Sequence, residues 1–184
     1  MSPKNLIKNS SLDTYTPTKQ DLERTNLLLD IFEECENKGI KISIFGGYGL
    51  DSLYGKLTRG HEDIDISISK EDEEVFVKII KAKGFVLEKG YFNPKEYKME
   101  YLKEGFLLEY TTDDRLKYFP GMKREEFFPE KINGKLLGRA VRTPTLKGHK
   151  WMIEIQNKRA VTFGWGDYKH RQNQNLLIKA LEER

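Results

Sequence analysis

The most constraining feature of the chain is the segment Asp63-Ile64-Asp65-Ile66-Ser67-Ile68-Ser69, in which polar and apolar residues alternate strictly. Successive side chains of a β-strand point to opposite faces, so the pattern predicts a strand with three isoleucines on one face. That face must be covered by a hydrophobic core. Asp63 and Asp65 then share the other face, with their Cα atoms about 6.5 to 7 Å apart.

The residues around this strand predict a mixture of helices and further strands. Thr18 is suited to cap a helix, because Asp21 follows three residues later and an apolar helical pattern continues to Cys35. The order of the elements predicts an α+β protein in which helices pack on a small mixed β-sheet. Helices are predicted at 18–39, 48–54, 69–83, 143–157 and 167–183, and further strands at 40–45, 85–88, 97–103, 106–112 and 136–142.

The length of 184 residues fits one domain, and two small lobes are also compatible with it. Residues 1–16 are polar and without periodicity, which predicts a flexible leader. Residues 17–184 are then a single domain, with 143–184 as its C-terminal helical part. The single cysteine, Cys35, excludes an intrachain disulfide and a cysteine-based zinc site.

The net charge of +3 is close to neutral for a chain of this size, so a general nucleic-acid binder is not favoured. No stretch reaches the 18 or so apolar residues that a membrane span needs. A soluble protein of the cytoplasm, where nucleoside triphosphates and magnesium are available, is the simplest expectation. A monomer and a homodimer are both compatible with the sequence.

The chemistry is expected between Phe45 and Ser69. Two carboxylates on one strand face repel each other unless a cation lies between them, and Mg²⁺ prefers such oxygen ligands. The alternative for Asp63 and Asp65 is a solvated strand face. Gly46-Gly47 lies between a strand and a helix, where bare backbone admits a polyphosphate, although an ordinary tight turn has the same composition.

Three further side chains are candidates for the same site. Arg59 and His61 lie just upstream of the acidic pair and are able to hold phosphate, or are surface residues. Glu109 lies in the apolar run Phe106–Tyr110 and is expected to face the metal or act as general base if its strand lies beside the Asp63 strand. The alternatives are a surface glutamate on an edge strand, with Asp113 or Asp114 as the third acid.

Taken together, these residues resemble the aminoglycoside and lincosamide nucleotidyltransferases of the polymerase-beta-like superfamily. The resemblance is dense over about twenty residues and thinner at Leu107-Leu108-Glu109 and 165–170. The residues that carry its dense part are Gly46-Gly47-Tyr48-Gly49-Leu50-Asp51, Gly55, Thr58-Arg59, His61 and Asp63-Ile64-Asp65.

The resemblance implies the nucleotidyltransferase fold and the transfer of a nucleoside monophosphate, with one or two Mg²⁺ ions and ATP or another nucleoside triphosphate. By motif position, Asp63, Asp65 and Glu109 bind metal, and Glu109 is also the base. Gly46 and Gly47 let the triphosphate approach the backbone, while Arg59, His61 and Lys169 contact phosphates. Two residues depart from the superfamily pattern: Gly47 stands where serine is frequent, and Glu109 where aspartate is frequent.

The expected acceptor is a small-molecule antibiotic, with aminoglycosides slightly favoured over lincosamides. An acidic cluster at Glu62, Asp63, Asp65 and 71–74 suits a cationic aminoglycoside, and the aromatic stretches 118–120 and 127–129 suit a lincosamide or sugar ring, or the core. A toxin-type enzyme that modifies RNA or protein is an alternative. Its candidate contacts are basic residues that phosphate binding or helix solvation explains equally well: Lys147, Lys150, Lys158, Arg159, Lys169 and Arg171. A non-catalytic nucleotide-binding module is a third.

Overall fold

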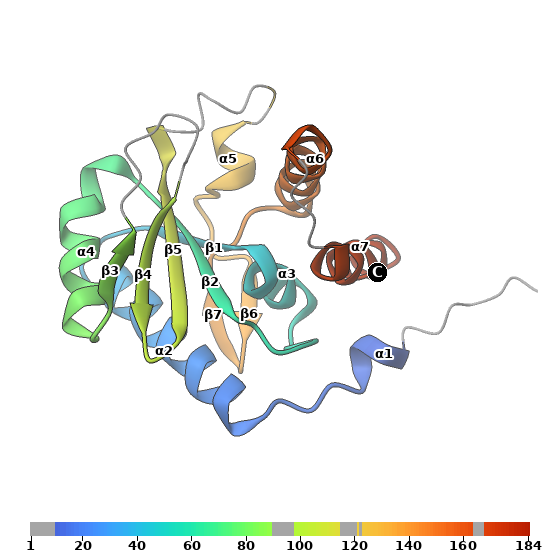
Figure 1. Cartoon of the computed structure of the whole chain (residues 1–184), viewed down its shortest axis with the longest axis horizontal. Helices are drawn as coiled ribbons and strands as arrows, with labels where there is room; N and C mark the ends of the chain where they lie inside the picture. Colours follow the sequence, from blue (N-terminus) through green and yellow to red (C-terminus); the bar gives the residue numbers. More distant parts are fainter. Residues whose placement is uncertain (1–9, 90–97, 115–120, 122, 164–167) are drawn as a thin grey trace, which may run out of the picture.

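The computed structural model describes residues 10–89, 98–114, 121, 123–163 and 168–184, and side chains at 12–88, 98–114, 121, 123–155 and 174–184. A five-stranded mixed sheet is flanked by helices (Figure 1), which confirms the predicted α+β class. The strands are β1 Ile42–Phe45, β2 Asp63–Ile68, β3 Val86–Lys89, β4 Met99–Lys103 and β5 Phe106–Thr112. The helices are α1 Ser10–Asp13, α2 Lys19–Asn37, α3 Gly46–Tyr54, α4 Glu73–Ala82, α5 Arg124–Phe127, α6 Leu146–Phe163 and α7 Tyr168–Glu182.

The sheet has the strand order β1-β2-β5-β4-β3, in which β2 and β5 run parallel and the other neighbours run antiparallel. The three isoleucines of β2 are fully buried, as their alternation predicts. They share a hydrophobic core with apolar residues of α2 and α4, among them Leu28, Phe32, Phe76 and Ile80. Burial of the isoleucines thus anchors β2 and turns Asp63 and Asp65 toward the opposite face.

The first long helix, α2, begins where the sequence predicts. Thr18 is its N-cap, and its hydroxyl accepts a hydrogen bond from the Asp21 amide while the Asp21 carboxylate accepts one from the Thr18 amide. This reciprocal pair satisfies donors that the first helical turn leaves free. Gly39, with a φ of 74°, follows the end of the helix, where glycine is preferred.

Several predicted boundaries are corrected by the structure. The helix predicted from Ser69 begins as a short 3₁₀ turn, Lys70–Asp72, and the Ser69 hydroxyl donates to the Glu71 carboxylate at 3.3 Å instead of capping it. The strand predicted at 136–142 is a hairpin, β6 Gly134–Leu136 and β7 Arg139–Val141, turned at Leu137-Gly138. Helix α3 begins earlier, at Gly46 rather than Tyr48. Helix α6 begins at Leu146 rather than Thr143, since the Thr145 hydroxyl accepts from the Gly148 amide.

The C-terminal helices pack on α3 through a second apolar cluster. Leu50 and Tyr54 of α3 contact Ile153 of α6 and Leu177 and Ile178 of α7 in this cluster. In Figure 1, α5, α6 and α7 lie together on the side of the sheet where α3 lies, away from α4. A bilayer-spanning helix is absent from the described part of the chain. Of the predicted leader, residues 10–13 form α1, and residues 1–9 lie outside the described residues.

Candidate functional site

Three carboxylates meet on the sheet face opposite the isoleucines. In the parallel register of β2 and β5, Asp65 lies directly beside Glu109, and Asp63 precedes Asp65 by two residues on the same face. One carboxylate oxygen from each of Asp63, Asp65 and Glu109 lies within 4.8 Å of the others, and all three residues are half-buried. The structure therefore brings together the acids that the sequence selects. A compact set of hard oxygen donors of this kind fits a divalent cation such as Mg²⁺.

The rival acids Asp113 and Asp114 have other partners. Asp113 accepts hydrogen bonds from the Lys70 amide at 3.0 Å and from the Arg124 guanidinium at 3.0 Å. Asp114 accepts one from the Thr112 hydroxyl at 2.5 Å. Neither is part of the carboxylate cluster among the described residues, so Glu109 is the third acid of the site.

The carboxyl groups of Asp63 and Glu109 lie in an environment that raises their pKa. Burial, and next the neighbouring Asp65 carboxylate, raise the pKa of Asp63. Burial is also the largest influence on Glu109 and raises its pKa to about 7, with Asp65 acting in the same direction and Lys98 against it. A carboxyl group with a pKa near neutrality exchanges a proton readily at physiological pH.

The glycine bend lies directly against this cluster. Gly46 ends the β1–α3 turn with a φ of 64°, and a β-carbon there would overlap Asp65 Oδ2 and lie 2.9 Å from Asp65 Cγ. Only glycine satisfies both conditions. A β-carbon at Gly47 would lie 2.5 Å from His61 Nδ1 and 2.7 Å from Arg59 Nη2, which explains why this chain has no serine there. The amino end of α3, where free amides attract anions, thus opens beside the acids.

His61 is a buried residue at this bend rather than a surface one. Its Nε2 lies 2.7 Å from Asp51 Oδ2, and its ring stacks on Tyr48 with centroids 4.2 Å apart. Asp51 also accepts from the amide and hydroxyl of Thr58, at 3.0 and 2.6 Å. The His61 Nδ1 atom has no hydrogen-bond partner among the described residues. Asp51 therefore orients His61 so that Nδ1 faces Gly47, a contact that sequence reasoning missed.

The two other predicted phosphate contacts differ in what the structure shows. Arg59 lies at the same bend, where Nη1 donates to the Gly60 carbonyl at 2.9 Å and its charge favours the ionised form of Asp63. Lys169 belongs to α7, but its side chain lies outside the described side chains. The bend thus gathers Gly46, Gly47, Arg59 and His61 beside the acids, and Lys169 stays a prediction.

Sequence reasoning also missed Lys98. Its Nζ lies 2.6 Å from Asp65 Oδ1, bonds the Glu109 carboxylate as well, and lies 5.6 Å from the centroid of the Phe45 ring. In β4, Glu100 lies opposite Glu109, so Lys98, two residues before it, falls on the acidic face. The alternation of Lys98 and Glu100 was a signal, but the register that gives it meaning is a property of the folded sheet.

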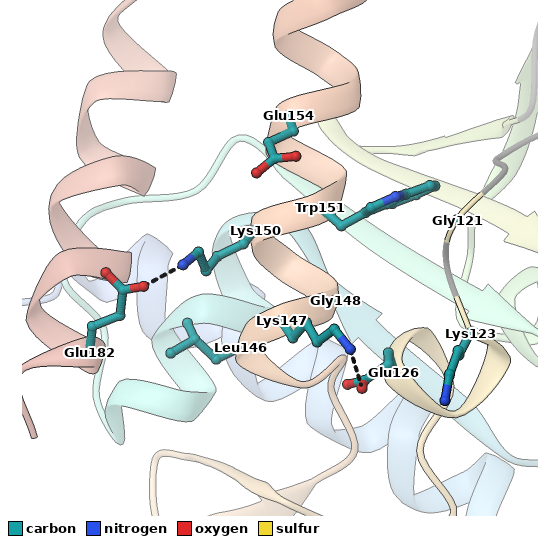
Figure 2. A pocket seen from close by; sticks show the side chains of 10 residues that line it. All are labelled: Gly121, Lys123, Glu126, Leu146, Lys147, Gly148, Lys150, Trp151, Glu154 and Glu182. Atoms are coloured by element: carbon teal, nitrogen blue, oxygen red, sulfur yellow. Dashed lines mark hydrogen bonds and ion pairs between the residues drawn. The ribbon is translucent and has the colours of Figure 1, made fainter.

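A cavity of about 470 Å³ lies beside α5, α6 and α7 (Figure 2). Two ion pairs lie in its lining: Lys147 contacts Glu126, and Lys150 contacts Glu182. Trp151 lies between these pairs and Gly121. The lining does not include the three acids of the sheet, and the predicted basic contacts Lys147 and Lys150 face glutamates. The cavity lining is Gly121, Lys123, Glu126, Leu146, Lys147, Gly148, Lys150, Trp151, Glu154 and Glu182.

The aromatic stretches have different outcomes. Phe127 and Phe128 are buried, and the Phe127 ring packs 5.5 Å from that of Phe45. They serve the core, which was one of the two uses predicted for them. Tyr118 and Phe119 lie outside the described residues.

Comparisons with known proteins support the predicted family resemblance. A model of the aminoglycoside-2''-adenylyltransferase family matches residues 27–109, a range that runs from α2 to Glu109. A 2''-aminoglycoside nucleotidyltransferase of Escherichia coli is 26% identical over 141 residues, which are 71% of this chain and 73% of that protein. The predicted resemblance is confirmed, and since these relatives are nucleotidyltransferases, so is an enzyme of that type.

Two solved structures share the fold. The antibiotic-resistance factor ANT(2'')-Ia superimposes with a TM-score of 0.71 at 20% identity, over 88% of this chain and 85% of that one. The lincosamide antibiotic adenylyltransferase LnuA, with lincomycin bound, superimposes with a TM-score of 0.60 at 19% identity, over 91% of this chain and 99% of that one. The expected nucleotidyltransferase fold is therefore confirmed.

Proposed function

We propose that this chain, which resembles the aminoglycoside-2''-adenylyltransferase family over residues 27–109, transfers AMP from ATP to a hydroxyl of an aminoglycoside antibiotic, with Mg²⁺ as cofactor. The observation that carries the proposal is the convergence of Asp63, Asp65 and Glu109 beside the Gly46 bend. The three carboxylates provide oxygen ligands for a hard cation, and the backbone amides at the start of α3 provide a binding site for a polyphosphate.

Each group at the site has a defined task in this reaction. Asp63, Asp65 and Glu109 hold the metal. Arg59, His61 and the amides of the α3 amino end bind the triphosphate, with Lys169 as a further phosphate contact. When bound, Mg²⁺ neutralises phosphate charge and orients the reacting groups.

The chemical step is an in-line displacement. The acceptor hydroxyl oxygen attacks the α-phosphorus of ATP, the bond to the β-phosphate oxygen breaks, and pyrophosphate leaves. Glu109 takes the hydroxyl proton, a role supported by its half-buried position directly beside Asp65. This assigns Glu109 as the base.

The choice of acceptor is supported by charge and by the relatives. An aminoglycoside carries several ammonium groups, and Glu62, next to Asp63 in the chain, is exposed. The family and the curated relative act, by name, on aminoglycosides, whereas LnuA binds lincomycin. The cavity of Figure 2 offers Glu154 and the Trp151 ring as acceptor contacts. A lincosamide is the second acceptor to test.

The proposal is tested by incubating the protein with ATP, GTP, CTP or UTP, Mg²⁺ and a panel of aminoglycosides and lincosamides. Mass spectrometry then detects nucleoside monophosphate adducts of the antibiotics. We expect an adenylylated aminoglycoside, and none with Asp65→Asn as the matched control. A folded protein that forms no adduct with any antibiotic would contradict the acceptor assignment, and transfer that persists in excess chelator would contradict the metal assignment.

The proposed reaction uses ATP and Mg²⁺, which are available in the cytoplasm, so the cytoplasm is the proposed location of the protein.

A further inference from the structure

The ammonium group of Lys98 lies where two of the three site acids converge. It lies 2.6 Å from Asp65 Oδ1 and also bonds Glu109, while among the described contacts it makes no hydrogen bond to Asp63. Asp65 and Glu109 are 12% and 13% exposed, and the Lys98 side chain is 34% exposed. A single positive charge on a flexible stem thus neutralises one end of a half-buried acidic cluster.

An ammonium group and a divalent cation cannot both use these oxygens. Mg²⁺ bonds its oxygen ligands at about 2.0 to 2.1 Å, which requires the space that the Lys98 nitrogen takes beside Asp65 and Glu109. Two cations in that space would also repel each other strongly. Of these three groups, Lys98 is the one able to leave, since its side chain is more exposed than those of Asp65 and Glu109 and its four-carbon stem is flexible.

We propose that Lys98 is a built-in counter-ion of the site: it holds Asp65 and Glu109 together while no metal is bound, and it is displaced when a divalent cation binds. The inference rests on the proposed function, because it takes the acidic cluster as the metal site. It assigns Lys98 as a positioning residue that lowers the affinity of the free site for metal and keeps the ion-free site assembled.

The test is metal binding without nucleotide or acceptor. Mn²⁺ is titrated into the protein and followed by electron paramagnetic resonance, for the parent chain, Lys98→Met and Lys98→Arg. Loss of the competing charge is expected to lower the Mn²⁺ dissociation constant of Lys98→Met by about tenfold or more. Lys98→Arg, which keeps the charge, should remain near the parent value. Lys78→Met is the matched control, since Lys78 is an exposed lysine of α4 paired with Glu74.

Thermal unfolding provides the second readout. Without metal, Lys98→Met is expected to unfold at a lower temperature than the parent chain, because three carboxylates are left without their counter-ion. Saturating Mn²⁺ should remove that difference. If Lys98→Met cannot be purified folded, amine acylation of the parent chain mapped by mass spectrometry replaces it: Lys98 should react faster when Mn²⁺ is present, and Lys78 at an unchanged rate.

The outcomes separate this inference from the proposed function. If the parent chain binds Mn²⁺ and Asp65→Asn does not, but Lys98→Met binds it equally or more weakly, the counter-ion role is wrong and the metal site stands. An acylation rate at Lys98 that Mn²⁺ leaves unchanged has the same meaning. If neither the parent chain nor Lys98→Met binds Mn²⁺, both the counter-ion and the metal site are wrong.

Discussion

The two faces of the central sheet differ in chemistry: one carries apolar side chains whose burial stabilises the fold, and the other carries carboxylates that are costly to bury. On one face, Ile64 and Ile66 are fully buried in the core that α2 and α4 complete. On the other, Asp63 and Asp65 are half-buried beside Glu109, and burial and a neighbouring carboxylate raise the pKa of Asp63 and of Glu109. Both faces come from the same strand, β2, because its successive side chains point in opposite directions.

The difference teaches that stability and chemistry are divided between alternate residues of β2. Apolar burial on one face stabilises the position of the backbone, and that position holds the acids in an arrangement they would not adopt on their own. Substitutions on the isoleucine face should therefore change the free energy of unfolding. Substitutions on the acidic face should change the reaction, and the four predictions below test this division.

The largest expected effect is on the acidic face. Asp65→Asn keeps the size of the side chain and removes a charge from the proposed metal site, so we expect the rate of the proposed AMP transfer to fall by about a thousandfold or more, or about 4 kcal/mol. The free energy of unfolding should stay within about 1 kcal/mol of the parent value, since the relieved repulsion with Asp63 offsets the lost attraction to Lys98. Transfer assays and urea unfolding of the same preparation check both parts. A variant that keeps a tenth of the parent rate would break the division.

The neighbouring position on the other face should behave in the opposite way. Ile66→Ala removes a fully buried side chain and should lower the free energy of unfolding by about 2 to 5 kcal/mol, measured by urea unfolding. The rate of transfer per folded molecule should change little, because the acids keep their positions. Ile66→Val, expected to cost about 0.5 to 1.5 kcal/mol, is the graded control. A large loss of activity in folded Ile66→Val would show that the faces are coupled.

The pH dependence of stability sharpens the comparison further. The pKa of Glu109 rises from 4.5 in a free side chain to about 7 in the folded protein, so the folded state binds a proton more tightly than the unfolded state. The resulting stabilisation is complete below pH 4.5 and is lost as the pH rises through about 7, by about 1 to 3 kcal/mol in metal-free protein.

Glu109→Gln isolates this contribution. The difference in unfolding free energy between the variant and the parent chain, measured in chelator from pH 4.5 to 8, should change across this range because only the parent titrates at Glu109. Ile66→Val is the control and should show a difference that is constant with pH. A constant difference for Glu109→Gln as well would mean that the carboxyl group is not perturbed by folding.

Much of this comparison was predictable from sequence because it depends on local patterns. The alternation of β2 predicts which residues are buried, and the Thr18 capping box predicts where α2 begins. Glu109 was expected to meet the aspartates only if its strand, β5, lay beside β2. The structure satisfies this condition, because β5 pairs with β2 in parallel. These predictions use the geometry of single elements, which the residues themselves determine.

The contacts that were missed depend on pairings between distant segments. Lys98 reaches Asp65 only because β4 and β5 pair in one register, and Asp51 reaches His61 across the loop after α3. The alternation of Lys98 and Glu100 places Lys98 on one face of a strand, but no sequence pattern shows which strand that face lies beside, and the Asp51–His61 contact has no periodic signal. The β6–β7 hairpin was missed for a local reason, since leucine is an unusual residue for a turn that requires positive φ.

That turn provides the smallest expected effect and a control away from both faces. Leu137 and Gly138 have φ values of 46° and 82°, the sign that a two-residue type I′ turn requires at both positions. Leu137→Asn creates the preferred Asn-Gly pair and relieves strain in an exposed side chain, so we expect the free energy of unfolding to rise by about 0.5 to 1 kcal/mol. Thermal and urea unfolding measure the gain, and Leu137→Ala, which keeps the unfavourable backbone, should not share it. The rate of transfer should equal that of the parent chain, because the hairpin contributes no residue to the acidic face; a change in rate would mean that the site extends beyond the sheet.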